Sequence, residues 1–210
     1  MPRIAEIQPT LLSVVWPENN ISIPHRLLRT LLLAVLGSLF VALLAQVQVP
    51  LWPVPITGQT FGVLVIGMVF GLRLGALTLL LYLLEGHLGL PVFAGGKSGL
   101  VGPTSGYLVG FVFAAAITGY LAEKKWDRNV LFTGLAMLLG NLAIYIPGLI
   151  WLTMFFDGPG SQYMSAIGAS SAISAALEKG LLPFIIGDFL KLALAAIIFP
   201  YVWRLLGRFK

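Results

Sequence analysis

Residues 27–47 read LLRTLLLAVLGSLFVALLAQV and carry a single charged side chain, Arg29. A helix that crosses the hydrocarbon core of a bilayer needs about 20 consecutive, mostly apolar residues. This stretch meets that requirement and contains no proline. The sequence therefore predicts a transmembrane helix here, and the rest of the chain has to be interpreted with lipid as the surrounding solvent.

The overall composition supports a membrane protein. Hydrophobic residues make up 58% of the chain and charged residues only 10%, with a mean hydropathy of +0.95, whereas soluble domains carry about 25% charged residues. The 210 residues suit about six spans with short loops, which leaves no room for a soluble catalytic domain. The chain has no cysteine and two isolated histidines, so we expect no disulfide, iron–sulfur cluster or metal site.

A hydropathy window of about 19 residues places five further spans after the first. They are expected at about residues 58–72, 74–90, 107–121, 130–156 and 181–206. Residues 157–180 are rich in Ser, Ala and Gly, which makes them too polar for a span. We expect them to form an ordered surface segment with a short helix.

Loop charges predict the orientation, because short cytoplasmic loops carry the excess of Lys and Arg. With the N-terminus inside, the inner side would hold ten cations, namely Arg3, Arg26, Arg29, Arg73, Lys124, Lys125, Arg128, Arg204, Arg208 and Lys210. The outer side would hold only Lys97 and Lys179, and Lys191 would be the one cation inside the membrane. We therefore expect an all-α integral membrane protein with six transmembrane helices and both termini cytoplasmic. Residues 1–26 would be a retained cytoplasmic arm and residues 27–207 the membrane domain.

Function in such a bundle is expected where polar groups stand inside the membrane, because a charge near the bilayer centre costs roughly 2.5 to 3.5 kcal/mol or more. Asp188 and Lys191 lie three residues apart in the last span and share one helix face. Either they form an internal ion pair that only holds helices together, or they bind a ligand. In the ligand interpretation Asp188 accepts N–H bonds and Lys191 donates to a carbonyl, a pattern that suits a cyclic urea.

Other polar side chains within the spans are weaker candidates. Tyr82 and Glu85 share a face of the third span, and Asn141 and Tyr145 share a face of the fifth. Structural and functional roles are equally expected for Tyr82 and Glu85. For Asn141 an interhelical hydrogen bond is favoured.

The loop FAGGKSG, residues 93–99, resembles a phosphate-binding loop only superficially, because Pro91 occupies the position of the first glycine. No ATP binding by this chain is expected. Successive glycine N–H groups beside Lys97 would suit a carboxylate at the outer mouth of a pocket, and a plain turn of the chain is the alternative.

Small residues recur every four positions in the first span, at Ala34, Ser38 and Ala42. Such a stripe lets another helix approach closely. It serves either packing within the bundle or the docking of a separate protein.

Four motifs, PVPIT.QT (53–60), GLPVFAGG (89–96), GPTSGYLVGF (102–111) and GD..K (187–191), stand in this order. Together they resemble the BioY family, the biotin-specific S components of energy-coupling factor (ECF) transporters, over roughly residues 28–205. The family commonly has an uncharged or small residue where this chain has Glu85 and His87.

The resemblance implies a six-helix protein that captures biotin from outside and resides in the prokaryotic cell membrane. It implies a transmembrane T component and two cytoplasmic ATPases as partners, so that ATP is hydrolysed by them and not by this chain. It further implies that Asp188 and Lys191 contact the biotin head group and that the small-residue stripe docks the T component. Phe93 and Tyr107 are the expected walls for the rest of the ligand, and Lys97 the partner of its carboxylate.

The expected function is thus a high-affinity biotin-binding subunit of an ATP-driven vitamin uptake transporter, not an enzyme. The alternatives are an S component for another vitamin, such as thiamine or riboflavin, and a solitary proton-coupled carrier with Asp188 or Glu85 as the proton site. An intramembrane enzyme is disfavoured, because no nucleophile with a base, no metal-ligand set and no paired carboxylates are present. No nucleic-acid partner is expected, because the net charge of +5 is explained by the Lys and Arg residues in the loops on the inner side of the lipid bilayer.

Overall fold

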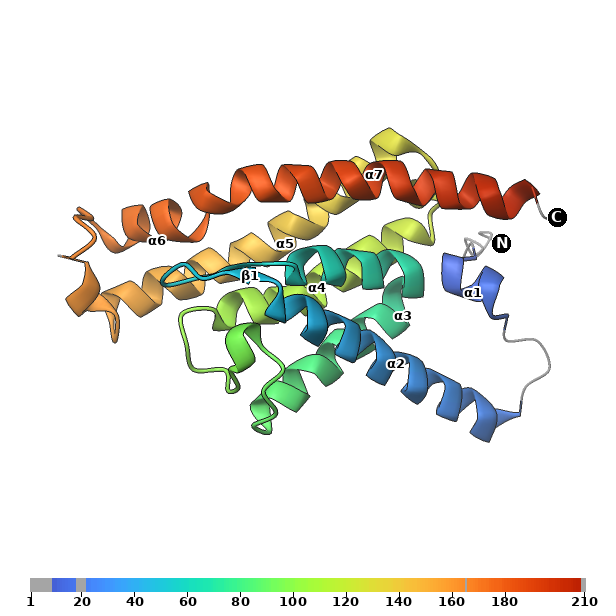
Figure 1. Ribbon diagram of the computed structural model, residues 1–210, viewed down its shortest axis with the longest axis horizontal. Helices are drawn as coiled ribbons and strands as arrows, with labels where there is room; N and C mark the ends of the chain where they lie inside the picture. The colour runs from blue at the N-terminus through green and yellow to red at the C-terminus, as the bar shows by residue number, and fades with distance from the viewer. Residues whose placement is uncertain (1–8, 18–21, 165, 209–210) are drawn as a thin grey trace, which may run out of the picture.

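Long apolar helices lying side by side make up the structure, a computed structural model that describes residues 9–17, 22–164 and 166–208 (Figure 1). The helices are α1 (Leu11–Val15), α2 (Ile23–Gln46), α3 (Gln59–His87), α4 (Ser105–Ala122), α5 (Val130–Asp157), α6 (Ala172–Gly180) and α7 (Ile185–Arg208). A short antiparallel hairpin of β1 (Gln48–Val49) and β2 (Ile56–Thr57) joins α2 to α3. Single 3₁₀ turns stand at η1 (Ala94–Gly96), η2 (Trp126–Arg128), η3 (Ser161–Tyr163) and η4 (Leu182–Phe184). The helical membrane fold expected from the sequence is confirmed.

Helix α3 is broken at Gly71, whose φ of +80° and ψ of −179° interrupt the helical backbone. Residues with a side chain rarely adopt this conformation. A Cβ atom at this position would also lie 2.6 Å from the Glu123 carboxylate. The two parts of α3 run in different directions from the break (Figure 1), in agreement with the separate spans expected at 58–72 and 74–90.

Five helical stretches in the described part of the chain are long and apolar enough to cross a membrane, and α3 is one of them. The break at Gly71 divides that stretch in two, which accounts for the expected six spans. Helix α2 begins at Ile23, a turn earlier than expected, because Pro24 lies at its start, where proline is favoured.

The segment between α5 and α7 contains the short helix that its composition predicts. Ser171 begins α6 with a capping box, in which its hydroxyl accepts from the Ser174 backbone N–H at 3.1 Å. Small residues of α6, among them Ala175 and Ala176, are buried. The segment therefore packs against the bundle through the small residues of α6.

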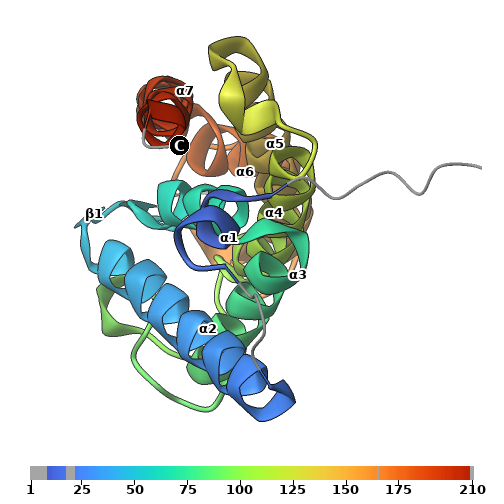
Figure 2. The same cartoon turned by 90° about the vertical axis from the view of Figure 1, so that its right-hand side faces the viewer.

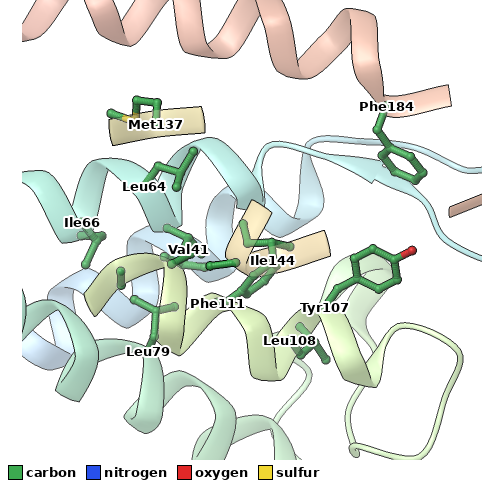
Figure 3. Close-up of a cluster of buried hydrophobic side chains, with 14 of the residues drawn as sticks. Val41, Leu64, Ile66, Leu79, Tyr107, Leu108, Phe111, Met137, Ile144 and Phe184 are labelled. Carbon is green, nitrogen blue, oxygen red and sulfur yellow. The ribbon is translucent and has the colours of Figure 1, made fainter. Parts of the chain in front are cut away.

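Small residues allow α4 to pack closely against its neighbours. A Cβ atom on Gly110 would lie 2.8 Å from Ile144 of α5, and one on Gly119 would lie 2.4 Å from the backbone of Gly71. Figure 3 shows buried side chains of the same helices, including Phe111 of α4, Leu64 of α3 and Ile144 of α5. Because lipid is as apolar as the side chains, such close packing replaces the hydrophobic effect as the force between helices.

The end of the bundle that holds α1 also holds the last turns of α7 (Figure 1). Asp127 of η2 is buried there, and its carboxylate accepts the indole N–H of Trp203 from α7. The Arg128 guanidinium lies 4.1 Å from the centre of the Trp203 ring. Burial raises the pKa of Asp127 to about 6, although the Trp203 hydrogen bond and Arg128 act in the opposite direction.

Candidate functional site

A cavity of about 150 Å³ lies at the opposite end of the bundle, between the hairpin, the loop after α3 and helices α4, α5 and α7. Its volume is about ten times the roughly 10–15 Å³ that one water requires, so it suits a small organic molecule. The lining residues are Pro53, Val54, Pro55, Thr57, Gln59, Thr60, Phe93, Ala94, Lys97, Ser98, Gly99, Gly102, Pro103, Thr104, Tyr107, Leu108, Phe111, Ile144, Tyr145, Phe184 and Lys191. Apolar and aromatic walls with a few polar groups are typical of small-molecule sites.

The polar end of this cavity is built around the two charged residues of α7. The Lys191 amino group lies 3.1 Å from Oδ1 of Asp188, and Asp188 is buried. The same amino group donates to the Thr57 carbonyl at 3.0 Å and to the Thr60 hydroxyl at 2.8 Å. Lys191 therefore joins α7 to the hairpin and to the first turn of α3. Lys191 lines the cavity, whereas Asp188 does not and contacts it through Lys191 and Tyr145.

Tyr145 of α5 completes the environment of the carboxylate by donating its hydroxyl to Oδ2 of Asp188. Each oxygen of Asp188 thus has a donor from a different side chain. The Tyr145 ring also lines the cavity. The sequence pattern grouped Tyr145 with Asn141 on one helix face but gave it no site role.

Thr57, Gln59 and Thr60 line the cavity as well, and sequence reasoning did not select them. All three lie in the PVPIT.QT motif, and this motif is the sequence feature that could have indicated them as site residues. Lys191 binds the backbone carbonyl of Thr57, and every residue type has such a carbonyl, so side-chain chemistry could not indicate this contact.

Aromatic side chains form the walls. Phe93, Tyr107 and Phe184 are buried and line the cavity, and Figure 3 shows Tyr107 and Phe184 at the same side of the buried cluster. The Tyr107 hydroxyl donates to the Gly180 carbonyl at 2.9 Å, and its ring meets Tyr145 edge-on with centroids 6.1 Å apart. Tyr107 is thereby fixed between α4, α5 and the end of α6.

Lys97 lies on the loop after η1 and lines the cavity while its side chain is exposed. The neighbouring Gly95 and Gly96 both have φ of +69°, and the backbone N–H of Gly96 bonds the Phe93 carbonyl at 3.1 Å. The structure thus brings Lys97 to the cavity, at its open side.

Tyr82 and Glu85 do not line the cavity. Tyr82 is fully buried behind it, where its hydroxyl donates to the Val92 carbonyl at 2.8 Å and accepts from Gln59 at 2.7 Å. Tyr82 therefore supports a lining residue. Glu85 instead accepts a hydrogen bond from Ser38 of α2.

Asn141 is buried one helical turn from Tyr145 and is also absent from the lining. Its Oδ1 has no hydrogen-bond partner in the structure. We have no physical account of this oxygen's isolation among the described residues, and the interhelical hydrogen bond expected for Asn141 stays a prediction. No group of three or more metal-ligating side chains gathers within the described residues.

The small-residue stripe of α2 lies inside the bundle. Ala34, Ser38 and Ala42 are buried, with 2%, 0% and 9% of their surfaces exposed. A Cβ atom on Gly37, beside the stripe, would lie 2.7 Å from Thr78 of α3. Packing within the chain therefore involves these positions, and docking of a separate protein on the stripe stays a prediction.

The fold and the cavity define a multi-pass membrane protein with a cavity of a size that suits a small molecule. A solved structure with this fold is described as the S component for biotin from an ECF-type ABC transporter. It aligns with a TM-score of 0.68 and 24% identity over 88% of this chain and 95% of that one.

Sequence comparison identifies the family. A profile of the BioY family matches residues 17–208. A Pyrococcus horikoshii protein named probable biotin transporter BioY is 39% identical over 78% of this chain and 91% of its own length. The Thermotoga maritima protein named biotin transporter BioY is 38% identical over 77% of this chain and 90% of its own. The chain belongs to the BioY family, as its motifs predict.

Proposed function

We propose that this chain is a high-affinity biotin-binding membrane subunit of a vitamin uptake transporter. The observation that carries the proposal is the cavity lined by Lys191, whose amino group is paired with the buried Asp188. The names of the relatives from Pyrococcus horikoshii and Thermotoga maritima support biotin as the substrate.

The chemistry of biotin matches the polar end of the cavity. Its ureido ring offers two N–H donors and one carbonyl acceptor, which suit a carboxylate and an ammonium group respectively. Asp188 would accept from the ring N–H groups and Lys191 would donate to the ring carbonyl. Lys191 donates to Asp188, Thr57 and Thr60, so a hydrogen bond from Lys191 to the ureido carbonyl would replace one of these three contacts.

The rest of the ligand would extend toward the open side of the cavity. The thioether ring and the alkyl chain would lie against Phe93, Tyr107 and Phe184, which are buried and apolar on their ring faces. The carboxylate would reach Lys97, the exposed cation at the cavity's open side. Mismatched ligands would leave buried donors and acceptors unpaired, which supplies the selectivity.

Orientation and partners complete the proposal. The excess of Lys and Arg on one side would place both termini in the cytoplasm and the cavity toward the outside of the prokaryotic cell membrane. The solved S component with this fold comes from an ECF-type ABC transporter, which supports a T component and two ATPases as partners. The chain would then be no enzyme and need no cofactor, since the partners hydrolyse ATP.

Calorimetric titration of detergent-purified protein with biotin tests the substrate. We expect nanomolar affinity, and we expect thiamine and riboflavin not to compete. Tight binding of either of those vitamins with no response to biotin would overturn the proposal.

A biotin analogue tests the assignment of Lys191. In 2-iminobiotin an imino group replaces the ureido oxygen, and near neutral pH the resulting cyclic guanidine is protonated, so it offers Lys191 no acceptor and places a positive charge beside it. We expect weaker binding of this analogue to the wild type and a smaller difference between the two ligands in Lys191→Met. An unchanged ratio of the two affinities in Lys191→Met would exclude contact between Lys191 and the ureido oxygen.

A further inference from the structure

A second and larger cavity, of about 660 Å³, lies at the other end of the bundle from the biotin site. Helix α1, the start of α2, the break in α3 and the end of α4 surround it. Figure 2 looks at this end and shows α1 in front, with α2 and α3 beside it. Nothing in the proposed transport function uses this cavity.

The charge of the cavity lining is strongly positive. Arg26, Arg29, Arg73 and Lys124 contribute four cations, and Glu123 is the only acid among the lining residues. One oxygen of Glu123 already accepts the backbone N–H of Leu72 at 2.9 Å, at the start of the second part of α3. The carboxylate is therefore engaged with the broken helix.

Three of these cations are exposed, and two of the three, Arg73 and Lys124, are available to a ligand. Arg73 and Lys124 are exposed, and neither forms an ion pair with a carboxylate in the described part of the chain. Lys124 only approaches the Tyr120 ring, with 5.4 Å between its amino group and the ring centre. A ligand with a concentrated negative charge could pair with both Arg73 and Lys124.

Apolar walls adjoin the cations. Phe70, Leu74 and Leu77 of α3 line the same cavity, and Leu77 and Tyr120 are 45% and 49% exposed. A free anion would gain nothing from these surfaces. An amphipathic molecule with an anionic head and a hydrocarbon tail would cover both kinds of surface.

We propose that this cavity binds the phosphate headgroup of an anionic phospholipid of the inner leaflet. Basic pockets beside transmembrane helices on the cytoplasmic side recognise such headgroups through charge. Arg73 and Lys124 bind the phosphate from the exposed side, and the acyl chain lies along Leu77 and Tyr120. The location in the inner leaflet rests on the proposed orientation, whereas the binding itself does not.

Native mass spectrometry of the full chain tests this with dioleoyl phosphatidylglycerol and dioleoyl phosphatidylcholine, which share their acyl chains. We expect preferential retention of phosphatidylglycerol, and binding that weakens as ionic strength rises. In Arg73→Gln with Lys124→Gln we expect affinity for phosphatidylglycerol to fall on the order of 30-fold. Arg204→Gln, an exposed cation of α7 outside this cavity, is the matched control and should bind as the wild type does.

Three results would overturn the proposal. The first is equal retention of the two lipids by the wild type, and the second is unchanged phosphatidylglycerol affinity in the double variant. The third is binding of soluble glycerol 3-phosphate without binding of phosphatidylglycerol, which would make the cavity a site for a soluble phosphate. The salt dependence of the wild type gives a decisive readout even if the double variant fails to fold.

Discussion

Replacing both charged residues of the polar end, Asp188→Asn together with Lys191→Met, is expected to abolish tight biotin binding while leaving the protein stable. The reason is that replacing one residue of an ion pair and replacing both residues have different effects on stability. Removing one partner of a buried pair leaves an uncompensated charge, whereas replacing both by neutral residues of similar size is often neutral or stabilising.

The structure predicts unequal effects of the single variants on stability. Lys191→Met leaves the Asp188 carboxylate buried with Tyr145 as its remaining donor, which should cost about 3 to 5 kcal/mol. Asp188→Asn leaves Lys191 with the Thr57 carbonyl and the Thr60 hydroxyl. The lysine side chain is also 20% exposed, so this change should cost less, about 1 to 3 kcal/mol.

The effect on biotin affinity should follow a different order. Each hydrogen bond to a charged group contributes about 1.5 to 3 kcal/mol. Loss of both groups therefore removes about 3 to 6 kcal/mol, which weakens binding roughly 10²- to 10⁴-fold. The double variant should thus be the most stable of the three variants and bind biotin no better than either single variant.

Thermal unfolding in detergent and calorimetric titration with biotin measure the two quantities separately. Wild-type affinity in the double variant would show that the pair does not contact the ligand. A double variant less stable than Lys191→Met would refute the reasoning about the uncompensated carboxylate.

Three further predictions concern residues around the two ends of the bundle. Tyr145→Phe removes the hydroxyl donated to Asp188 and should weaken biotin binding about 10-fold, at the low end of a charged hydrogen bond; unchanged affinity in calorimetry would contradict this. Ala34→Trp should lower the unfolding temperature and reduce biotin binding with it, because overpacking a buried site costs about 1 to 3 kcal/mol or more. Val35→Trp, at a neighbour that is 44% exposed, should be tolerated, and normal stability with loss of transport only in Ala34→Trp would instead favour the docking interpretation. Burial raises the pKa of Asp127 from 3.8 to about 6, so the folded state binds this proton more tightly than the unfolded state does and stability falls as pH rises toward 6. The unfolding temperature of the wild type relative to Asp127→Asn should therefore decrease from pH 5 to pH 7, and a constant difference would be inconsistent with the raised pKa.

The sequence predicted the helices because lipid imposes a simple rule on length and polarity. The boundaries of α4 and α5 agree with the expected spans within two residues. The break in α3 was also foreseeable, since Arg73 interrupts the apolar run next to Gly71. Patterns of this kind depend only on neighbours along the chain.

The candidate site was predictable only in part. Asp188 and Lys191 stand out because charges are rare in a span, and the GD..K motif singles out the same residues. Tyr145 does not stand out, since a tyrosine in a span has many uses, and only the fold shows that it meets Asp188. Glu85 drew attention for its charge, yet its partner is Ser38 on another helix, and helix faces alone do not predict which helices become neighbours.

An ammonium group has three protons to donate, and Lys191 uses them on Asp188, Thr57 and Thr60. None is left over for a ligand. A biotin oxygen can therefore accept a proton of Lys191 only if one of these three acceptors loses its hydrogen bond from the lysine. If that acceptor is Thr57, ligand binding removes the hydrogen bond between α7 and the hairpin; if it is Thr60, ligand binding removes the hydrogen bond between α7 and the first turn of α3. Because Lys191 can donate only three hydrogen bonds, the ligand-bound and ligand-free proteins would then differ in which parts of the chain the lysine connects.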